Sequence, residues 1–229
     1  MPTEPPLVRA SSLSVGYGGF PVCPPVDLTL RPGQALAVVG ANGTGKSTLL
    51  RTLLGLQSPL GGKVSLLGAE PDPRDAGSRA AIATVLGEDA FFPGLTVTEH
   101  LLLTALGHAL PDARGVVTDL VDEFGLTDRA DALPSALSSG QRRRVLLAAA
   151  FVRPRSLLVL DEPEQRLDSG MRNRLTDLLV EEREIGGAVL FASHDAVVVR
   201  GAATSVLLLH DDGVTVVDPE AGAAAIDSL

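Results

Sequence analysis

The apolar positions along the chain follow two different patterns. Residues 7–15 and 26–30 alternate apolar and polar side chains, as expected of strands with one buried face. Residues 35–39, 157–160 and 188–192 are almost wholly apolar, which is typical of strands covered on both faces. The first pattern predicts an antiparallel sheet near the N-terminus, and the second predicts a buried parallel sheet.

Helical periodicity separates several of these strands. Residues 47–54 place four leucines at helical spacing, and residues 170–184 form a second helical stretch. A longer helical block spans residues 96–151. It is broken at three positions, Pro111, Gly125 and Pro134. Strands that alternate with helices favour an α/β fold with a mainly parallel sheet, into which the long block is inserted as a helical subdomain.

The remaining segments complete the predicted sheets. Four further strands are expected, at 63–67, 82–86, 205–209 and 214–217. The last two flank Asp211-Asp212-Gly213, a turn signal that predicts a hairpin. The tail, 219–229, is small and apolar from Ala221 onward and is expected to be frayed or lightly docked.

Composition narrows the class of protein. The 229 residues carry 19 Lys and Arg against 28 Asp and Glu, a formal net charge of −9, which disfavours a nucleic-acid partner and direct docking on an anionic membrane. The longest apolar run, 145–152, is far shorter than the roughly 20 residues that span a bilayer, and the N-terminus has no signal-peptide core. A single cysteine, Cys23, excludes an intrachain disulfide. We therefore expect a cytoplasmic protein without direct membrane insertion.

Residues 40–47 match the P-loop pattern between a predicted strand and a predicted helix. Glycines let the backbone fold tightly so that successive N–H groups point at phosphate oxygens, and the following helix adds its positive end. Lys46 would reach the β- and γ-phosphates, and the hydroxyl of Ser47 would bind Mg²⁺. The motif thus predicts that ATP or a related nucleotide binds at Gly40, Ala41, Asn42, Gly43, Thr44, Gly45, Lys46, Ser47 and Thr48.

Residues 157–163, Leu-Leu-Val-Leu-Asp-Glu-Pro, have the form of a Walker B strand. Their apolar residues bury a strand that delivers two carboxylates at its C-terminal end, the edge where open α/β sheets bind ligands. Asp161 would hold the Mg²⁺ shell, and Glu162 would polarise an attacking water.

Residues 137–141, Leu-Ser-Ser-Gly-Gln, precede three arginines and an apolar helix. A serine hydroxyl, glycine N–H groups and a helix N-terminus together form an anion site, although the same residues suit a simple helix cap. The order of P-loop, pentapeptide, Walker B strand and a histidine after the next strand, His194, resembles the ATP-binding subunit of ABC transporters along nearly the whole chain.

The resemblance implies a fold and a set of partners. It implies a P-loop NTPase core made of residues 1–88 and 152–218, a helical subdomain at 89–151 and a separate membrane-spanning permease, so that the chain would lie at the cytoplasmic face of the membrane. Two ATPase subunits, as a homodimer or a heterodimer, would pair head to tail. Each signature would then cover the ATP on the other subunit's P-loop through Ser138, Ser139, Gly140 and Gln141.

The same resemblance assigns roles to single residues. Tyr17 is similar to the aromatic side chain that stacks on adenine, and His194 to the histidine that contacts the γ-phosphate. Asp168 matches an aspartate near the nucleotide, at the seam of the dimer. Glu162, His194 and Lys46 would be the catalytic residues, with ATP and Mg²⁺ as the bound groups.

Three positions depart from the family pattern. Gly87 stands where the family usually has a glutamine that touches Mg²⁺, so that Glu88 would have to substitute or the site would be weakened. Ser139 replaces a glycine, which is tolerable if the local φ is negative. In the segment 165–168, the bulky Arg166 would sit at the dimer seam.

Several alternatives stay open at this point. The leading interpretation is a transporter ATPase with export slightly favoured, and the alternatives are a regulatory or asymmetric module with weak turnover and a soluble ABC ATPase without a transport role. A GTPase is disfavoured because no Asn-Lys-x-Asp motif occurs. Phe91 and Phe92 suit either core packing or contact with a membrane subunit. The arginine run 142–144 is expected to be a solvated helix face.

Overall fold

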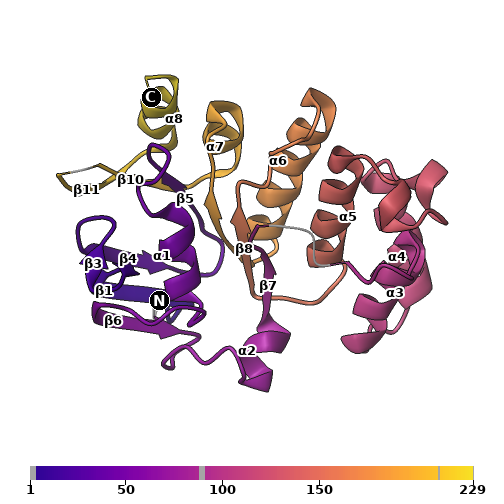
Figure 1. The fold of residues 1–229 in the computed structure, drawn as a ribbon, viewed down its shortest axis with the longest axis horizontal. Coiled ribbons are helices and arrows are strands. Elements are labelled where there is room, and N and C mark those ends of the chain that lie inside the picture. The colour runs from indigo at the N-terminus through magenta and orange to yellow at the C-terminus, as the bar shows by residue number, and fades with distance from the viewer. Residues whose placement is uncertain (1–3, 88–90, 211, 229) are drawn as a thin grey trace.

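The computed structural model describes residues 4–87, 91–210 and 212–228 (Figure 1). Its largest sheet has six strands, in the order β11 (Val214–Val217), β10 (Ser205–Leu209), β5 (Ala35–Val39), β9 (Ala188–Ala192), β8 (Leu157–Asp161) and β7 (Ile82–Val85). All neighbouring pairs are parallel except β10 with β11. Every residue of β5 and β9 is buried, as the uninterrupted apolar runs predict.

A second, antiparallel sheet orders the strands β4 (Val26–Leu30), β1 (Val8–Ser14) and β6 (Gly61–Leu66). The residues of β4 alternate strictly between buried and exposed, which confirms the half-buried pattern. Two short strands that the sequence did not predict, β2 (Gly16–Tyr17) and β3 (Phe20–Pro21), form a small hairpin between β1 and β4.

Helices cover both faces of the main sheet. They are α1 (Lys46–Leu53), α2 (Ala76–Ala81), α3 (Val97–Gly107), α4 (Ala113–Glu123), α5 (Ser139–Phe151), α6 (Ser169–Glu184), α7 (Ala196–Ala202) and α8 (Pro219–Asp227), with two 3-10 turns at Thr127–Arg129 and Pro134–Ala136. The three predicted breaks in the long block fall between its helices. In Figure 1, α3, α4 and α5 gather at one end of the molecule, away from the antiparallel sheet.

Two apolar clusters sandwich the main sheet. One contains the leucines of α1 and the inner face of the antiparallel sheet. The other joins the opposite face of the main sheet to α3, α4, α5, α6 and α7. Because both faces are covered, the polar loops that follow the strands can reach solvent only at the ends of the sheet.

The C-terminal tail is more ordered than the sequence predicts. Residues 219–227 form α8, which begins at the capping aspartate Asp218, whose carboxylate accepts from the backbone N–H of Ala221 at 2.9 Å. Gly222 and Ala223 are buried against the sheet, so the expectation of a frayed or lightly docked tail is wrong for this segment. The sequence did not predict this helix because its alanine and glycine residues give only a weak hydrophobic pattern. The predicted hairpin of β10 and β11 forms, but Asp211 of its turn lies outside the described residues.

Replacing Gly222 with valine tests how firmly α8 is docked. A Cβ atom at Gly222 would lie 2.6 Å from Cγ2 of Val206 on β10. We expect Gly222→Val to lower the free energy of unfolding by about 2 kcal/mol, because overpacking a tight contact forces the backbone to shift. Urea or thermal unfolding measures this, with Ala224→Val on the exposed side of α8 as the matched control. Equal stability of the two variants would contradict firm docking.

Candidate functional site

The predicted site residues gather at the C-terminal edge of the parallel sheet. Strand β5 leads into the loop 40–45 and α1, β8 ends at Asp161, and β9 is followed by His194. These three strands are adjacent in the sheet, so their three loops meet. This is the edge where open α/β sheets bind ligands.

The phosphate-binding loop needs its glycines for two physical reasons. Gly43 and Gly45 have φ angles of +87° and +91°, which are strained for residues with a Cβ atom. A Cβ at Gly45 would also lie 2.5 Å from Cγ2 of Val22, and one at Gly40 would lie 2.8 Å from the carbonyl oxygen of Leu209. The loop can therefore curl this tightly only with glycine at these three positions.

Lys46 lies inside the loop rather than in solvent. Its side chain is only 5% exposed, and Nζ donates to the carbonyl oxygens of Gly40 at 2.8 Å and Ala41 at 3.0 Å. Burial lowers the pKa of Lys46, while the nearby carboxylates of Glu162 and Asp161 act in the opposite direction. The ammonium group is thus held where a phosphate oxygen could replace its carbonyl partners.

A cavity of about 150 Å³ lies beside this lysine. It is lined by Ser47, Gly87, Arg143, Asp161, Glu162, Gln165 and Arg166. The structure therefore brings together Ser47 and Asp161, the two predicted Mg²⁺ ligands, although they are far apart in sequence. It also places Gly87, which has no side-chain oxygen to offer, on the wall of the same cavity.

The donor set suits Mg²⁺ bound together with a nucleotide. Oδ1 of Asp161 is buried and has no hydrogen-bond partner in the part of the chain that the structure describes. Within those residues no group of three or more His, Cys, Asp or Glu side chains could hold a metal by itself. Mg²⁺ commonly takes one or two protein oxygens and completes its shell with phosphate and water. Asp161 and Ser47 fit that arrangement, whereas Glu88 lies outside the described residues.

The side chains of Glu162 and His194 lie close together at this edge of the parallel sheet. Nε2 of His194 lies 3.3 Å from Oε1 of Glu162, and both side chains are about one quarter to one third exposed. Glu162 has φ +47°, the left-handed region that is costly for a residue other than glycine. Its backbone N–H donates to the carbonyl oxygen of Ala192 at 2.9 Å, which ties the loop to β9.

Glu164 also belongs to this site, although its sequence position alone did not predict it. Its side chain is 9% exposed, and Oε1 accepts from Oγ of Ser193 at 2.7 Å and from the backbone N–H of His194 at 2.9 Å. Burial raises the pKa of the Glu164 carboxyl. Glu164 therefore holds the loop that carries His194. The signal was a third acidic residue soon after a buried strand, but acidic residues there are also common in exposed loops.

The arginine run is not the solvated face that the sequence predicts. Arg143 is only 8% exposed, and its guanidinium donates to the carbonyl oxygens of Asp161 and Glu162. Arg144 pairs with Asp168 and is 22% exposed, and Nη1 of Arg142 donates to the carbonyl oxygen of Leu137 at 2.9 Å. A run of like charges normally repels and faces solvent, but here each guanidinium has a different acceptor.

The signature residues start α5 and make a capping box. Oγ of Ser138 accepts from the N–H of Gln141 at 3.2 Å, and the N–H of Ser138 donates to Oε1 of Gln141 at 2.9 Å. Ser139 is the first helical residue and is not among the residues with positive φ, so its replacement of glycine adds no such strain. Gly140 lies so close to the carbonyl oxygen of Arg166 that a Cβ would be 2.7 Å away. None of the four lines the cavity described above.

Two further predicted residues, Tyr17 and Asp168, are not among those that line this cavity. Tyr17 is 60% exposed on β2, with its hydroxyl 3.2 Å from Oγ1 of Thr48 on α1. Its ring is therefore free to contact a ligand beside the P-loop. Asp168 caps α6, where Oδ1 accepts from the N–H of Met171 at 2.9 Å.

The two phenylalanines near Gly87 take different environments. Phe91 packs partly buried against the apolar core, and its ring lies 5.4 Å from the ring of His100. Phe92 is 57% exposed. Core packing thus describes Phe91, while Phe92 keeps an apolar side chain in solvent.

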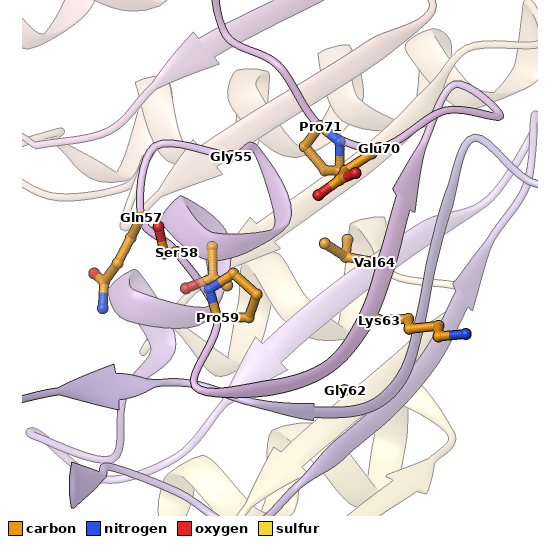
Figure 2. A pocket seen from close by; sticks show the side chains of 10 residues that line it. Gly55, Gln57, Ser58, Pro59, Gly62, Lys63, Val64, Glu70 and Pro71 are labelled. Atoms are coloured by element: carbon orange, nitrogen blue, oxygen red, sulfur yellow. The ribbon is translucent and has the colours of Figure 1, made fainter. Parts of the chain in front are cut away.

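A larger hollow, of about 450 Å³, lies elsewhere on the molecule (Figure 2). It is lined by Thr52 of α1, the loop residues that follow α1, and residues of β6 and of the segment at 70–71. Figure 2 shows the side chains of Lys63 and Glu70 among them. None of the predicted nucleotide-binding residues takes part, so this hollow is separate from the site.

Comparison with known proteins supports a nucleotide site. The sequence profile of a family described as ABC transporter matches residues 23–165. The chain is 40% identical to the lipoprotein-releasing system ATP-binding protein LolD 1 of Rhodopirellula baltica, over 76% of this chain and 81% of the relative. It is 39% identical to the cytochrome c biogenesis ATP-binding export protein CcmA of Ruegeria pomeroyi, over 82% of this chain and 84% of the relative.

Solved structures show the same architecture. The ATP-binding subunit of an ABC transporter superposes with a TM-score of 0.84 and 27% identity, covering 93% of this chain and 90% of the other. A dimeric ATP-binding cassette in a post-hydrolysis state, bound to ADP and Pi, has a TM-score of 0.81 at 24% identity, covers 93% of this chain and 98% of the other, and shows the fold alone.

The raised pKa of Glu164 predicts a specific pH dependence of stability. In the folded protein its carboxyl keeps a proton to higher pH than in the unfolded chain, so its stabilising contribution is complete below the unfolded pKa of about 4.3 and is lost as the pH rises through the folded value. Glu164→Gln removes this titration and keeps a carbonyl oxygen for Ser193 and His194.

We therefore expect the melting temperature of Glu164→Gln, relative to wild type, to increase as the pH rises from about 4 to about 8. Thermal unfolding of both proteins at several pH values measures the difference. Glu184→Gln, an exposed position on α6, serves as the matched control. A difference that stays constant across this pH range would contradict the prediction.

Proposed function

Because this chain belongs to the ABC transporter family of ATPases, we propose that it powers transport through a separate membrane-spanning permease by ATP-driven closure of a dimer. The observation that carries the proposal is the meeting of Lys46, Asp161, Glu162 and His194 at one edge of the sheet. Phosphoryl transfer to water requires a cation that binds phosphate, a carboxylate that binds the metal, and a carboxylate that lies beside a histidine.

The mechanism follows from the positions of these groups. The amides of the loop 40–45 and the end of α1 bind the phosphates, and Lys46 exchanges its carbonyl partners for oxygens of the β- and γ-phosphates. Ser47 and Asp161 would hold Mg²⁺, which when bound would neutralise charge on the phosphates. Glu162 orients a water and accepts its proton as the water attacks the γ-phosphorus and the bond to ADP breaks. Nε2 of His194, 3.3 Å from Oε1 of Glu162, would contact the γ-phosphate.

A second subunit completes the site. Ser138, Gly140 and the N-terminus of α5 form an anion-binding end, and within this chain they do not line the cavity with Glu162. We infer that they bind the γ-phosphate of ATP held by a second copy or a homologue. Tyr17 would stack on the adenine from the P-loop side.

The permease partner is inferred from the surface of the helical end. Phe92, Leu103 and Leu106 are 57%, 47% and 64% exposed, on α3 and the segment that precedes it. Among the described residues no helix is both long and apolar enough to cross a membrane. We propose that Phe92, Leu103 and Leu106 contact the permease, which would hold the chain at the cytoplasmic face of the membrane.

Export is the direction we propose. The two relatives described above carry releasing and export in their names, at 40% and 39% identity. A sulfate/thiosulfate import ATP-binding protein of Synechococcus elongatus is 35% identical, and the chain spans 55% of its length. The release and export proteins thus share a higher sequence identity with this chain, and the chain covers more of their length.

A weak-turnover module is the second candidate function. Gly87 lines the cavity and supplies no metal-touching side chain there, which favours a site that binds ATP well but hydrolyses it slowly. A soluble ABC ATPase without a permease has no such specific support. Turnover by the purified chain separates the two remaining candidates.

We expect Glu162→Gln to lower Mg²⁺-dependent ATP turnover by about 100-fold or more while ATP binding is retained, because the amide cannot accept a proton from water. Phosphate release and ATP affinity measure the two effects. Glu184→Gln, far along α6, is the matched control and should leave both unchanged. Tight ATP binding with no turnover in the wild type would favour the weak-turnover module, and absence of ATP binding would overturn the proposed function.

A further inference from the structure

The side chain of Arg143 crosses from the signature helix to the catalytic loop. Arg143 lies on α5, shortly after the signature residues, and is only 8% exposed. Its Nη2 donates to the carbonyl oxygens of Asp161 at 2.7 Å and Glu162 at 2.6 Å, and its Nε reaches that of Pro163 at 3.4 Å. One guanidinium thus binds three consecutive peptide carbonyls.

The segment that it binds has an unfavourable backbone conformation. Glu162 has φ +47°, in the left-handed region that is unfavourable for a residue with a Cβ atom. In this conformation the carbonyls of Asp161 and Glu162 turn toward α5, and the Glu162 carboxylate turns toward His194. Without Arg143 the carbonyl of Asp161 would lose this donor in a partly buried place, which carries its own cost. The carbonyl of Glu162 would keep the backbone N–H of Gln165, at 3.1 Å.

The carboxylates around Arg143 favour its ionised form, against the effect of burial. Burial lowers the pKa of Arg143, and the carboxylates of Glu164, Asp161 and Glu162 oppose that shift. Arg166 is the neighbouring cation, and it acts in the same direction as burial. The guanidinium therefore serves as the buried counter-charge of the carboxylate cluster as well as the donor to its backbone.

We propose that Arg143 is a positioning residue for ATP hydrolysis: its planar guanidinium holds the backbone of residues 161–163 in the conformation that aims the Glu162 carboxylate. Arg143 does not touch the nucleotide in this role. The assignment deepens the proposed ATPase function, because it names the group that holds its catalytic loop. It also links α5, which Ser138 caps, directly to the loop that carries Glu162.

A second buried arginine supplies a matched control. Arg155 has a side chain 10% exposed, donates through Nη1 to the carbonyl oxygens of Ala150, Phe151 and Arg153, and pairs with Glu182. It precedes the first residue of β8, whereas Arg143 binds the residues at the other end of that strand. The two arginines therefore share their chemistry but lie at opposite ends of β8.

The test compares Arg143→Lys with Arg155→Lys in the full-length chain. Lysine keeps the charge but cannot bind several carbonyls with one planar fork. We expect Arg143→Lys to lower kcat by about 10- to 100-fold with the ATP Kd within about threefold of wild type, since misplaced catalytic groups cost rate more than affinity. Arg155→Lys should lower the melting temperature and leave kcat unchanged. Equal kcat losses in the two variants would overturn the proposal.

A double-variant cycle shows whether Arg143 acts through Glu162. In single-turnover measurements, Arg143→Lys should cause much less loss in the Glu162→Gln background than in wild type, because the group it positions is already absent. Independent, multiplicative losses would mean that Arg143 acts by another route.

Hydrogen exchange gives a readout that does not depend on turnover. We expect faster amide exchange in a peptide covering residues 161–165 of Arg143→Lys, and no such change there in Arg155→Lys. Unchanged exchange would overturn the positioning role even if the wild-type chain proved to hydrolyse ATP slowly. Loss of turnover in the wild type alone would count against the proposed function and not against this contact.

Discussion

The whole site depends on three neighbouring parallel strands that are buried on both faces. Strands β5, β8 and β9 have no polar side chain on either face until they end. Every group that contacts water, phosphate or metal must therefore lie at the edge where these strands end. Because the strands are parallel and adjacent, their three C-terminal ends lie together. The chemistry of the loop 40–45, of Glu162 and of His194 follows from this geometrical restriction.

Burial at that edge requires each ionisable side chain to have hydrogen-bond partners. Lys46 is held by two carbonyl oxygens, Glu164 by Ser193 and the backbone of His194, and Arg143 by the loop that carries Glu162. Removing one partner would leave a buried polar group unsatisfied, which costs more than the bond itself contributes. The same groups are thus both the structural support of the loops and the source of the local field.

The structure also explains how family departures can be accommodated. Ser139 replaces a glycine but starts a helix, where a side chain meets no positive-φ strain. Arg166 does adopt positive φ, at +64°, and its carbonyl oxygen contacts the Gly140 position so closely that only glycine fits. Gly87 leaves an open wall in the cavity beside Asp161. Local backbone geometry thus accommodates Ser139, whereas Arg166 takes an unfavourable conformation and Gly87 leaves the cavity wall without a side chain.

The sequence by itself determined the central strands, the P-loop, the Walker B carboxylates and the helix that follows Ser138, because each depends on a local pattern: a run of apolar residues, a glycine spacing or a capping box. It did not determine helix α8, whose small residues carry almost no periodic signal, nor the environment of Arg143 and Glu164. Only the tertiary structure decided those, because whether a charged side chain faces solvent or a buried carbonyl depends on residues that are distant along the chain.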